Sequence, residues 1–326
     1  MTPALRISVV LCTYNGEAYL AEQLRTLLVQ SRLPDEVVIG DDASSDGTWA
    51  IVEAFAAMAR TRDVVVNGVR RAERLGYVAN FSRTLELATG DLVFLCDQDD
   101  AWHPDKVAII EQRFREEALL TLVHTDARLV SADGSDLGHS LFEALELTPA
   151  ERLRVSSSRA LEVYLRRNIA TGATTAFRRG LLRQALPIPG SWIHDAWLAA
   201  FAAATGKVSL IDDPLIDYRQ HNGNQIGMRR RTIKDRLQEF RLPRGEELRA
   251  TAVRLEVLGE RLAENGALAQ VNDVLDMRTH ILRRIRIGER PLLSRVPAIA
   301  SEWLAGGYTR FATGTRSVLR DLLRKG

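Results

Sequence analysis

The sequence predicts an α/β protein with a mostly parallel sheet flanked by helices, followed by a helical appendage. Short β-branched apolar runs alternate with amphipathic helical patterns over the first 100 residues, which is the arrangement of βαβ units. After about residue 228 the pattern changes to helix-forming residues, with apolar side chains three and four positions apart. We therefore expect two domains, one over residues 1–228 and one over residues 229–326.

The first four strands are expected where apolar runs end in polar turn residues, and a helical pattern separates each run from the next. The predicted strands lie in residues 6–15, 35–48 (a short strand that breaks into a polar turn), 63–69 and 91–100, and the predicted helices occupy residues 17–31, 49–62 and 78–90. Further strand and helix patterns follow at 118–134, 168–182 and 193–221. Ligands of parallel sheets bind beyond the carboxyl ends of the strands, so the polar residues after each run are the candidate site.

Composition and charge exclude several classes of protein. No window approaches the ~18 uninterrupted apolar residues of a spanning helix, and the first residues lack the charged leader and cleavage site of a signal peptide. The two cysteines, Cys12 and Cys96, form no disulfide framework, so we expect both to be reduced core residues of a cytoplasmic protein. Recognition-helix, zinc-module and interleaved aromatic patterns are missing, so we expect no nucleic-acid partner.

The charge is unevenly divided along the chain. Residues 229–326 contain 21 Lys and Arg against 12 Asp and Glu, whereas residues 1–228 contain 23 against 30. Basic amphipathic helices of this kind favour the anionic surface of a membrane. The alternative is that these helices pack on the rest of the protein or on a second subunit, with their arginines in water.

The stretch "LVFLCDQDD" (92–100) places three carboxylates directly after an apolar strand. Such crowding raises the pKa of each group and is tolerable when a divalent cation neutralises the charge. Asp97 and Asp99 are therefore candidates to hold Mg²⁺ or Mn²⁺ on a diphosphate. The alternative is a solvated turn in which Asp100 caps a helix whose first turn is residues 102–106.

Three further segments carry candidate residues, each with a structural alternative. Asp42 follows the second strand, where a carboxylate can accept the imide N–H of a pyrimidine, and Asp46 is placed to cap the following helix. Asp195 begins an apolar helix between two tryptophans and is either a catalytic base or an N-cap. His221 lies in a polar loop and is either a metal ligand or a surface residue.

Taken in order, five segments resemble the family 2 inverting glycosyltransferases, which share the GT-A fold. The segments are "ISVVLCTYNGEAYLAEQLRTLLVQS", "VVIGDDASSDGT", "LGYVANFSRTLELATGDLVFLCDQDDAWHPDKV", "HDAWLA" and "YRQHNGN", within residues 6–227. The forms "DQDDAWHP" and "YRQHNGN" resemble the rhamnosyltransferase-like branch found in bacterial surface-polysaccharide assembly, including O-antigen.

The resemblance implies a role for each matching position. Tyr14 and Asp42 would hold a uracil or thymine base, and Asp97 would lie near the ribose. The nucleotide-binding set that the resemblance implies is Thr13, Tyr14, Asn15, Asp42, Asn80 and Asp97. The metal set that it implies is Asp97, Asp99 and His221, with Mn²⁺ or Mg²⁺ as the cofactor.

The same resemblance implies that Asp195 is the general base that deprotonates the acceptor hydroxyl. Many relatives carry a second large aromatic residue in "HDWW", where this chain has Ala196, so the wall of the acceptor site is smaller here. The expected reaction is metal-dependent, inverting transfer from a UDP- or dTDP-sugar to a glycan acceptor carried on a lipid. The expected location is the cytoplasmic face of a bacterial membrane, as a peripheral protein.

Two other functions remain open from the sequence. A sugar-1-phosphate nucleotidyltransferase also joins an α/β sheet to an Asp-bound metal, but it would have a glycine- and basic-residue-rich loop after the first strand, where this chain has "LCTYNGEAYL". A non-catalytic module that binds nucleotide sugars or glycans is the other alternative, and the candidate base Asp195 argues against it. The donor sugar, the linkage and the oligomeric state are not predicted.

Overall fold

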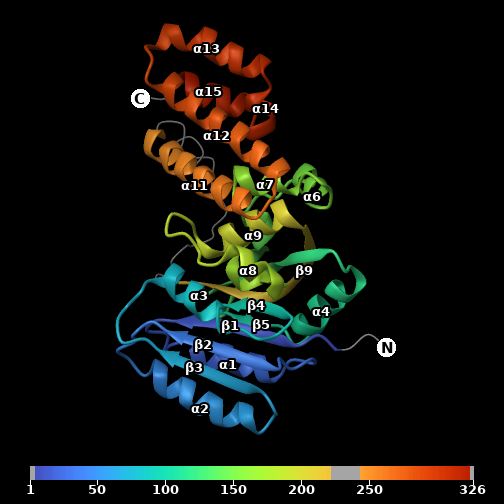
Figure 1. Ribbon diagram of the computed structural model, residues 1–326. Helices are drawn as coiled ribbons and strands as arrows, with labels where there is room; N and C mark the ends of the chain where they lie inside the picture. Colours follow the sequence, from blue (N-terminus) through green and yellow to red (C-terminus); the bar gives the residue numbers. More distant parts are fainter. Residues whose placement is uncertain (1–3, 222–242, 324–326) are drawn as a thin grey trace. The chain divides into compact units, whose positions relative to one another are not determined.

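The computed structural model describes residues 4–221 and 243–323, which form two compact units (Figure 1). Among the described residues, the first unit consists of 4–158 and 169–221, and the second consists of 159–168 and 243–323. The predicted boundary between residues 228 and 229, and the basic stretch 229–236, lie outside the described residues.

The first unit is built around one nine-stranded sheet with the order β3-β2-β1-β4-β8-β6-β9-β5, in which β7 pairs with β6. The strands are β1 (Ile7–Thr13), β2 (Glu36–Asp41), β3 (Val65–Arg70), β4 (Leu92–Cys96), β5 (Ala101–Trp102), β6 (Leu120–Ser131), β7 (Asp136–Ser140), β8 (Thr175–Arg178) and β9 (Lys207–Gln220). The helices are α1 (Leu20–Leu28), α2 (Thr48–Arg60), α3 (Tyr77–Leu85), α4 (Lys106–Glu116), α5 (Leu141–Ala144), α6 (Pro149–Val155), η1 (Gly172–Thr174), η2 (Arg179–Leu181), α8 (Leu182–Ala185) and α9 (His194–Thr205).

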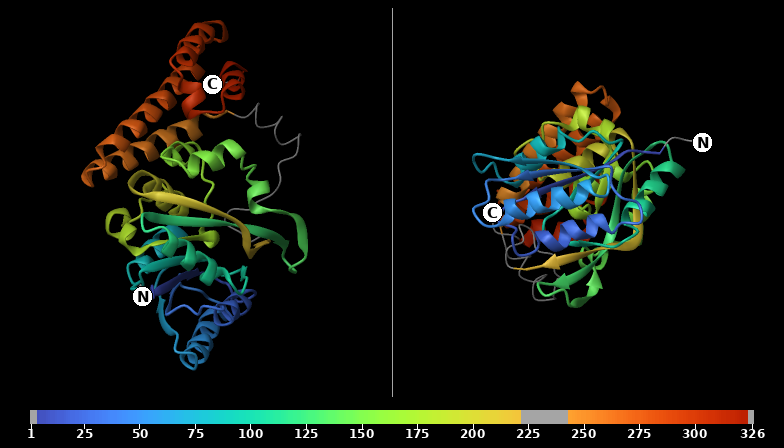
Figure 2. Two further views of the ribbon diagram at one scale, coloured as in Figure 1. Left: turned by 90° about the vertical axis from the view of Figure 1, so that its right-hand side faces the viewer. Right: turned by 90° about the horizontal axis from the view of Figure 1, so that it is seen from below.

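The α/β fold class predicted from the alternating patterns is confirmed, and the strand directions divide the sheet in two. The four strands β3, β2, β1 and β4 are parallel to one another, as the βαβ pattern requires. Beyond β4 the sheet is mixed, because β8 runs antiparallel to both β4 and β6. The long strands β6 and β9 then run parallel and side by side (Figure 2).

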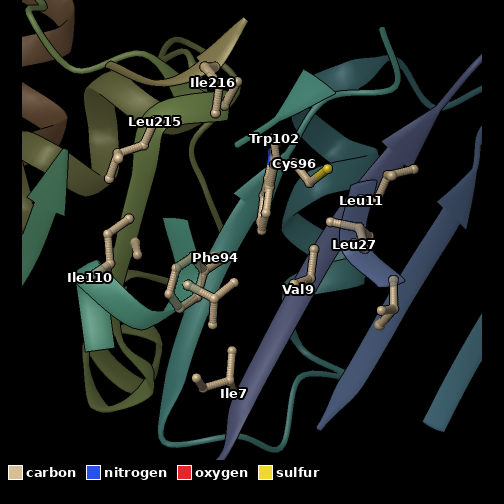
Figure 3. Close-up of a cluster of buried hydrophobic side chains, with 14 of the residues drawn as sticks. Ile7, Val9, Leu11, Leu27, Phe94, Cys96, Trp102, Ile110, Leu215 and Ile216 are labelled. Atoms are coloured by element: carbon tan, nitrogen blue, oxygen red, sulfur yellow. The ribbon is translucent and has the colours of Figure 1, made fainter. Parts of the chain in front are cut away.

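The core of this unit follows from the two-residue period of the strands. Ile7, Val9 and Leu11 of β1 point to the same face as Phe94 and Cys96 of β4, where α1 supplies its leucines (Figure 3). On the opposite face α3 packs on β1 and β2, and a Cβ on Gly40 would lie 2.1 Å from Thr84 Oγ1 of that helix. Glycine at position 40 therefore allows α3 to approach the carboxyl end of β2 closely.

The second unit is helical and comprises α7 (Ala160–Arg166), α11 (Gly245–Glu264), α12 (Leu268–Gly288), α13 (Leu292–Leu304), α14 (Gly307–Phe311) and α15 (Thr315–Leu323). Helices α11 and α12 form a long pair, and α13, α14 and α15 pack against α12 (Figure 1). A buried ion pair lies inside this unit, in which Arg284 donates to both oxygens of Asp321 at 2.6 and 3.1 Å. In the part of the chain that the structure describes, no helix is both long and apolar enough to cross a lipid bilayer.

Candidate active site at the carboxyl ends of the parallel strands

The strand register brings three polar segments to one edge of the sheet. Thr13 at the end of β1 is paired with Asp41 at the end of β2, and Leu11 is paired with Cys96 at the end of β4. The loops that follow these strands therefore begin within one or two residues of the same level. This is the edge at which parallel sheets bind ligands.

Gln98 ties the first and third of these loops together. Its side-chain oxygen accepts hydrogen bonds from Thr13 Oγ1 at 2.7 Å and from the Tyr14 backbone N–H at 2.9 Å, and its amide donates to the Tyr14 carbonyl at 3.2 Å. The Tyr14 ring lies 4.0 Å from the guanidinium carbon of Arg74. Thr13 and Tyr14 are therefore held by side chains that the sequence did not single out, since an amide between two aspartates carries no local signal of such a role.

The second loop is organised by Asn15 and Asp42. Asn15 has a positive φ of 46°, and its side-chain oxygen accepts from the Ser45 N–H at 2.9 Å. Both carboxylate oxygens of the buried Asp42 accept backbone N–H groups, from Leu75 at 2.7 Å and from Gly76 at 2.9 Å. The predicted nucleotide residues 15 and 42 thus also fix the shape of two loops. Helix α2 begins at Thr48 as expected, but the prediction that Asp46 caps it is wrong, because Gly47 holds the N-cap position; the Asp46 carboxylate instead accepts from the Thr48 N–H at 3.1 Å from one residue further out.

Asn80 is buried beneath this edge. Its amide donates to the Gly40 carbonyl at 2.7 Å, and its oxygen accepts from Arg71 Nε at 3.3 Å. Arg71 also donates to Thr84 Oγ1 at 3.3 Å. Arg71 is thus a cation held in place beside the predicted nucleotide residues, and the sequence analysis missed it.

The strand-end acidic cluster consists of Asp97, Asp99 and Asp100, with Lys106 beside it. Burial, together with the charges of Asp99 and Asp195, raises the pKa of Asp97 to about 7, and the Lys106 ammonium opposes this shift. Burial and the charges of Asp99 and Asp97 also hold the pKa of Asp100 well above its usual range. The cluster therefore resists carrying its full negative charge unless a further cation is present.

The sequence alternative in which Asp100 caps a helix is wrong. Helix α4 begins at Lys106 after Asp105, and Trp102 belongs to β5. Asp100 instead accepts from the backbone N–H of Arg219 at 3.0 Å. This contact joins the acidic cluster to the end of β9, next to His221.

His221 is brought directly onto Asp99. The two side chains are both mostly buried, and His221 Nε2 lies 2.8 Å from Asp99 Oδ2. The imidazole stacks on Tyr19, with ring centroids 4.8 Å apart, and Arg219 Nε donates to the Asp99 carbonyl at 2.9 Å. The structure therefore brings the predicted metal ligands 99 and 221 into contact from positions 122 residues apart in the chain.

Asp195 lies in the first turn of α9, and the alternative in which it caps that helix is wrong, because Ile193 holds the N-cap position. Its carboxylate accepts from the backbone N–H of Gly172 at 3.0 Å and from that of Ala196 at 2.5 Å. A Cβ on Gly172 would lie 3.8 Å from Asp195 Oδ2. Two backbone groups thus orient the carboxylate, whose charge acts on Asp97.

Two basic residues of this region were missed from the sequence. Lys106 is fully buried, donates to the Ala173 carbonyl of η1, and lies 3.9 Å from the centroid of the Trp102 ring. His194 is buried and stacks on Phe81 with ring centroids 4.0 Å apart, and neither ring nitrogen has a hydrogen-bond partner within the described residues. Burial lowers the pKa of both groups, to about 7 for Lys106.

The ligand atoms of Asp99 and His221 suit a cation whose coordination shell is completed by the substrate. Across residues 4–221 and 243–323, no group of three or more His, Cys, Asp or Glu side chains is arranged to hold a metal ion. Mg²⁺ at nucleotide sites takes only one or two carboxylates, with phosphate oxygens and water as the other ligands. The Asp99 carboxylate fits that mode of binding, the His221 imidazole adds a nitrogen beside it, and the two do not make an all-protein metal cage.

A parallel sheet with carboxylates at its strand ends, joined to a mixed extension that supplies a further aspartate, is the arrangement expected of the GT-A fold. The chain belongs to glycosyl transferase family 2, whose model matches residues 8–185.

Curated relatives agree with this family. The chain is 25% identical over 226 residues to the uncharacterized glycosyltransferase alr2836 of Nostoc sp., an alignment that covers 68% of this chain and 66% of that protein. It is also 25% identical over 233 residues to the dTDP-rhamnosyl transferase RfbG of Shigella flexneri, covering 67% of this chain and 73% of that protein. The chain spans a little under two thirds of the length of the first of these relatives.

Solved structures share the fold. The crystal structure of TarS residues 1–349 from S. aureus in complex with UDP-GlcNAc gives a TM-score of 0.56 at 19% identity, covering 97% of this chain and 90% of that chain. The mannosyltransferase PcManGT from Pyrobaculum calidifontis, in complex with GDP-Man and Mn²⁺, gives 0.50 at 18% identity, covering 98% and 86%. The GT-A fold predicted from the sequence is confirmed.

Proposed function

We propose that this glycosyltransferase is metal-dependent and inverting, and that it moves a sugar from a UDP- or dTDP-sugar to a hydroxyl of a glycan acceptor. The observation that carries the proposal is the electrostatic contact between two separate segments. Asp99 of the strand-end acidic cluster and Asp195 of α9 both raise the pKa of Asp97. Asp99, which is suited to the leaving diphosphate, and Asp195, which is suited to the attacking hydroxyl, are therefore both close enough to Asp97 to act on it electrostatically.

The donor nucleotide is assigned to the edge formed by the loops after β1 and β2. Tyr14 and Asp42 are proposed to hold the pyrimidine, and Asp97 to lie near the ribose. Asn15 and Asn80 are proposed to act by holding neighbouring groups, because the first fixes the loop at Ser45 and the second positions Arg71. A guanidinium beside this edge suits a diphosphate.

Asp99 and His221 are proposed to hold Mn²⁺ or Mg²⁺, with Asp97 as a further contact. When bound, the cation stabilises the negative charge that builds up on the departing diphosphate. The protein separately fixes His221 by stacking it on Tyr19, so the imidazole presents Nε2 to Asp99 without needing to reorient.

Asp195 is proposed to be the general base. The acceptor oxygen forms a bond to the anomeric carbon while the bond from that carbon to the phosphate oxygen breaks. The hydroxyl proton passes to the Asp195 carboxylate, and the nucleoside diphosphate leaves. One displacement without an enzyme nucleophile inverts the anomeric configuration.

The acceptor is proposed to be a bacterial surface glycan under assembly on a lipid carrier at the cytoplasmic membrane face. The likeness to RfbG, a dTDP-rhamnosyl transferase, supports a glycan acceptor and a deoxyhexose donor. The basic charge of residues 229–326 supports an anionic membrane surface.

The test is release of nucleoside diphosphate from a panel of UDP- and dTDP-sugars, with Mn²⁺ or Mg²⁺ and with EDTA. We expect Asp195→Asn to lower turnover by about 10²–10⁴-fold with little change in donor binding, since general-base catalysis contributes that much. Asp99→Asn should raise the concentration of Mn²⁺ needed for half-maximal activity.

Asp105→Asn is the matched control, because Asp105 is exposed and its side chain makes no capping bond on α4. It should leave both measurements unchanged. Undiminished turnover in Asp195→Asn would remove the base assignment. Release from no donor by correctly folded protein would favour the non-catalytic binding module.

A further inference from the structure

Helix α13 differs from an ordinary surface helix, because both of its charged residues face inward. Among its apolar residues, Ile299 is buried in a small apolar cluster against which Ala298 packs, and most of the others face out. Arg295 and Glu302 are 6% and 4% exposed. Leu293 and Leu304 are 88% and 86% exposed, and Leu292 and Val296 are each 54% exposed. Surface helices of globular proteins present the opposite pattern.

The two inward charges are bonded inside the helical unit, so the orientation of α13 is fixed. The Arg295 guanidinium donates to the carbonyls of Gly288 and Arg290, each at 2.8 Å. Glu302 accepts from Arg283 at 2.9 Å, and its other oxygen lies 2.7 Å from His280 Nδ1. Turning the helix to bury its leucines would move both charges into water and break these contacts.

The outward face of α13 is uncharged along its whole length. All of α13 lies within the described chain, and its exposed positions are Leu292, Leu293, Ser294, Val296, Pro297, Ala300, Ser301, Trp303 and Leu304. Figure 1 shows this helix at the margin of the helical unit. An apolar strip of this extent on a folded protein marks a surface that another phase or molecule covers.

The exposed charges that directly precede α13 in the chain are mostly basic. Arg286 and Arg290 are exposed at the end of α12 and in the turn before α13. The neighbouring acid, Glu289, is already paired with Arg249 at 3.0 Å. An apolar helix face with arginines at one end matches the interface of an anionic bilayer, with acyl chains beneath and phosphates alongside.

We propose that α13 is the element by which this protein docks on an anionic lipid surface, lying in the plane of the interface. A 13-residue helix is only about 20 Å long, which suits lying along a membrane and not crossing it. Leu292, Leu293, Val296 and Leu304 enter the acyl boundary, and Arg286 and Arg290 contact the headgroups. A second copy of the chain fits less well, because the strip offers no acidic partner for these arginines.

This inference rests on the proposed function in one respect, namely that a lipid-carried acceptor gives the protein a reason to dock on a membrane. Vesicle binding tests it, and that measurement does not require catalysis. The full chain is sedimented with vesicles of phosphatidylcholine alone or with about one third phosphatidylglycerol. We expect binding to the anionic vesicles, and a loss of at least ~10-fold in partition coefficient for the double variant Leu293→Ser, Leu304→Ser. Arg286→Gln with Arg290→Gln should weaken binding to anionic vesicles about tenfold.

The matched control is Leu268→Ser with Val253→Ser, since these side chains are exposed apolar residues of α12 and α11. It should bind like the unmodified protein. Equal binding by the α13 variant and the control would overturn the proposal, as would no binding of the unmodified protein to either vesicle. A dimer in gel filtration that only the α13 variant loses would assign the strip to a second copy.

Release of nucleoside diphosphate with a water-soluble acceptor is measured on the same variants. Normal release with lost vesicle binding supports the docking role and leaves the catalytic assignment intact. Vesicle binding by a protein that releases no diphosphate would contradict the proposed function alone.

Discussion

His124 provides a quantitative test of the burial in the first unit. It lies in β6, is fully buried, and meets the Phe142 ring edge-on with centroids 5.9 Å apart. Burial lowers the pKa of its imidazole from 6.5 to about 3. The folded protein therefore holds this side chain neutral at pH values at which the unfolded chain has already taken up a proton.

The sign of the pH dependence follows from that difference. Between pH 6.5 and about 3 the unfolded state binds more protons at position 124, so the free energy of unfolding falls as the pH falls. Each unit of pKa difference corresponds to about 1.4 kcal/mol. The contribution lost on going from pH 7 to pH 5 is thus about 2 kcal/mol, and by pH 4 it is about 3 kcal/mol.

Urea unfolding of the native protein and of His124→Gln at pH 7, 5 and 4 measures this contribution. Gln does not titrate, so the free energy of unfolding of the variant should fall by about 2 kcal/mol less between pH 7 and pH 5. Other titrating groups, including Asp97 and Asp100, are common to both proteins and cancel in the comparison. His139→Gln, at a less buried histidine of β7, is the control and should keep the full acid loss. Parallel pH curves for the native protein and His124→Gln would refute the reasoning.

Two further predictions concern the site and the helical unit. Gly172→Ala places a Cβ 2.9 Å from His194 Nε2 and should lower turnover by about 10–100-fold by displacing the candidate base. The control Gly180→Ala, whose Cβ meets only a side-chain atom at 3.6 Å, should leave turnover unchanged in the same diphosphate-release assay. Equal activity of the two variants would contradict this role of Gly172. Arg284→Met should lower the free energy of unfolding in urea by about 3–5 kcal/mol, because it removes the cation that pairs with the buried Asp321 carboxylate and leaves that charge uncompensated. Adding Asp321→Leu should restore most of that loss, so a double variant no better than the single one would contradict the prediction.

The parallel half of the sheet and its polar edge were predictable because the signals there are local. The short, β-branched apolar run 7–13 is bounded by polar turn residues and is too short for a typical helix, which favours a buried strand, and polar residues at its end are then expected at the edge of the sheet. The βαβ rule fixes the direction of the neighbouring strands, so residues 13, 42 and 97 were expected on one edge before any coordinates were known. The antiparallel insertion of β8 between β4 and β6 was not predictable, since pairing over such distances leaves no periodic trace.

The buried basic residues of the site were missed for a different reason. Lysine is nearly always solvated, so the sequence "HPDKV" suggests that Lys106 is a solvent-exposed residue at the start of a helix. Its burial depends on the Ala173 carbonyl and on the acidic cluster, which reach it from elsewhere in the chain. Likewise, the sequence predicts amphipathic helices after residue 228, but it does not determine which side of α13 is exposed to solvent.

That ambiguity has a physical origin. An amphipathic pattern states only that two faces differ in polarity, and the usual assumption buries the apolar one. In α13 the interior of the unit is partly polar, because the Arg284–Asp321 pair and the carbonyls bonded to Arg295 lie there beside the small apolar cluster of Ile287 and Ile299. The bonds that Arg295 and Glu302 make inside the unit hold the charged side of α13 inward, so the leucines on the other side stay exposed, and a pattern of polarity alone cannot reveal such long-range partners.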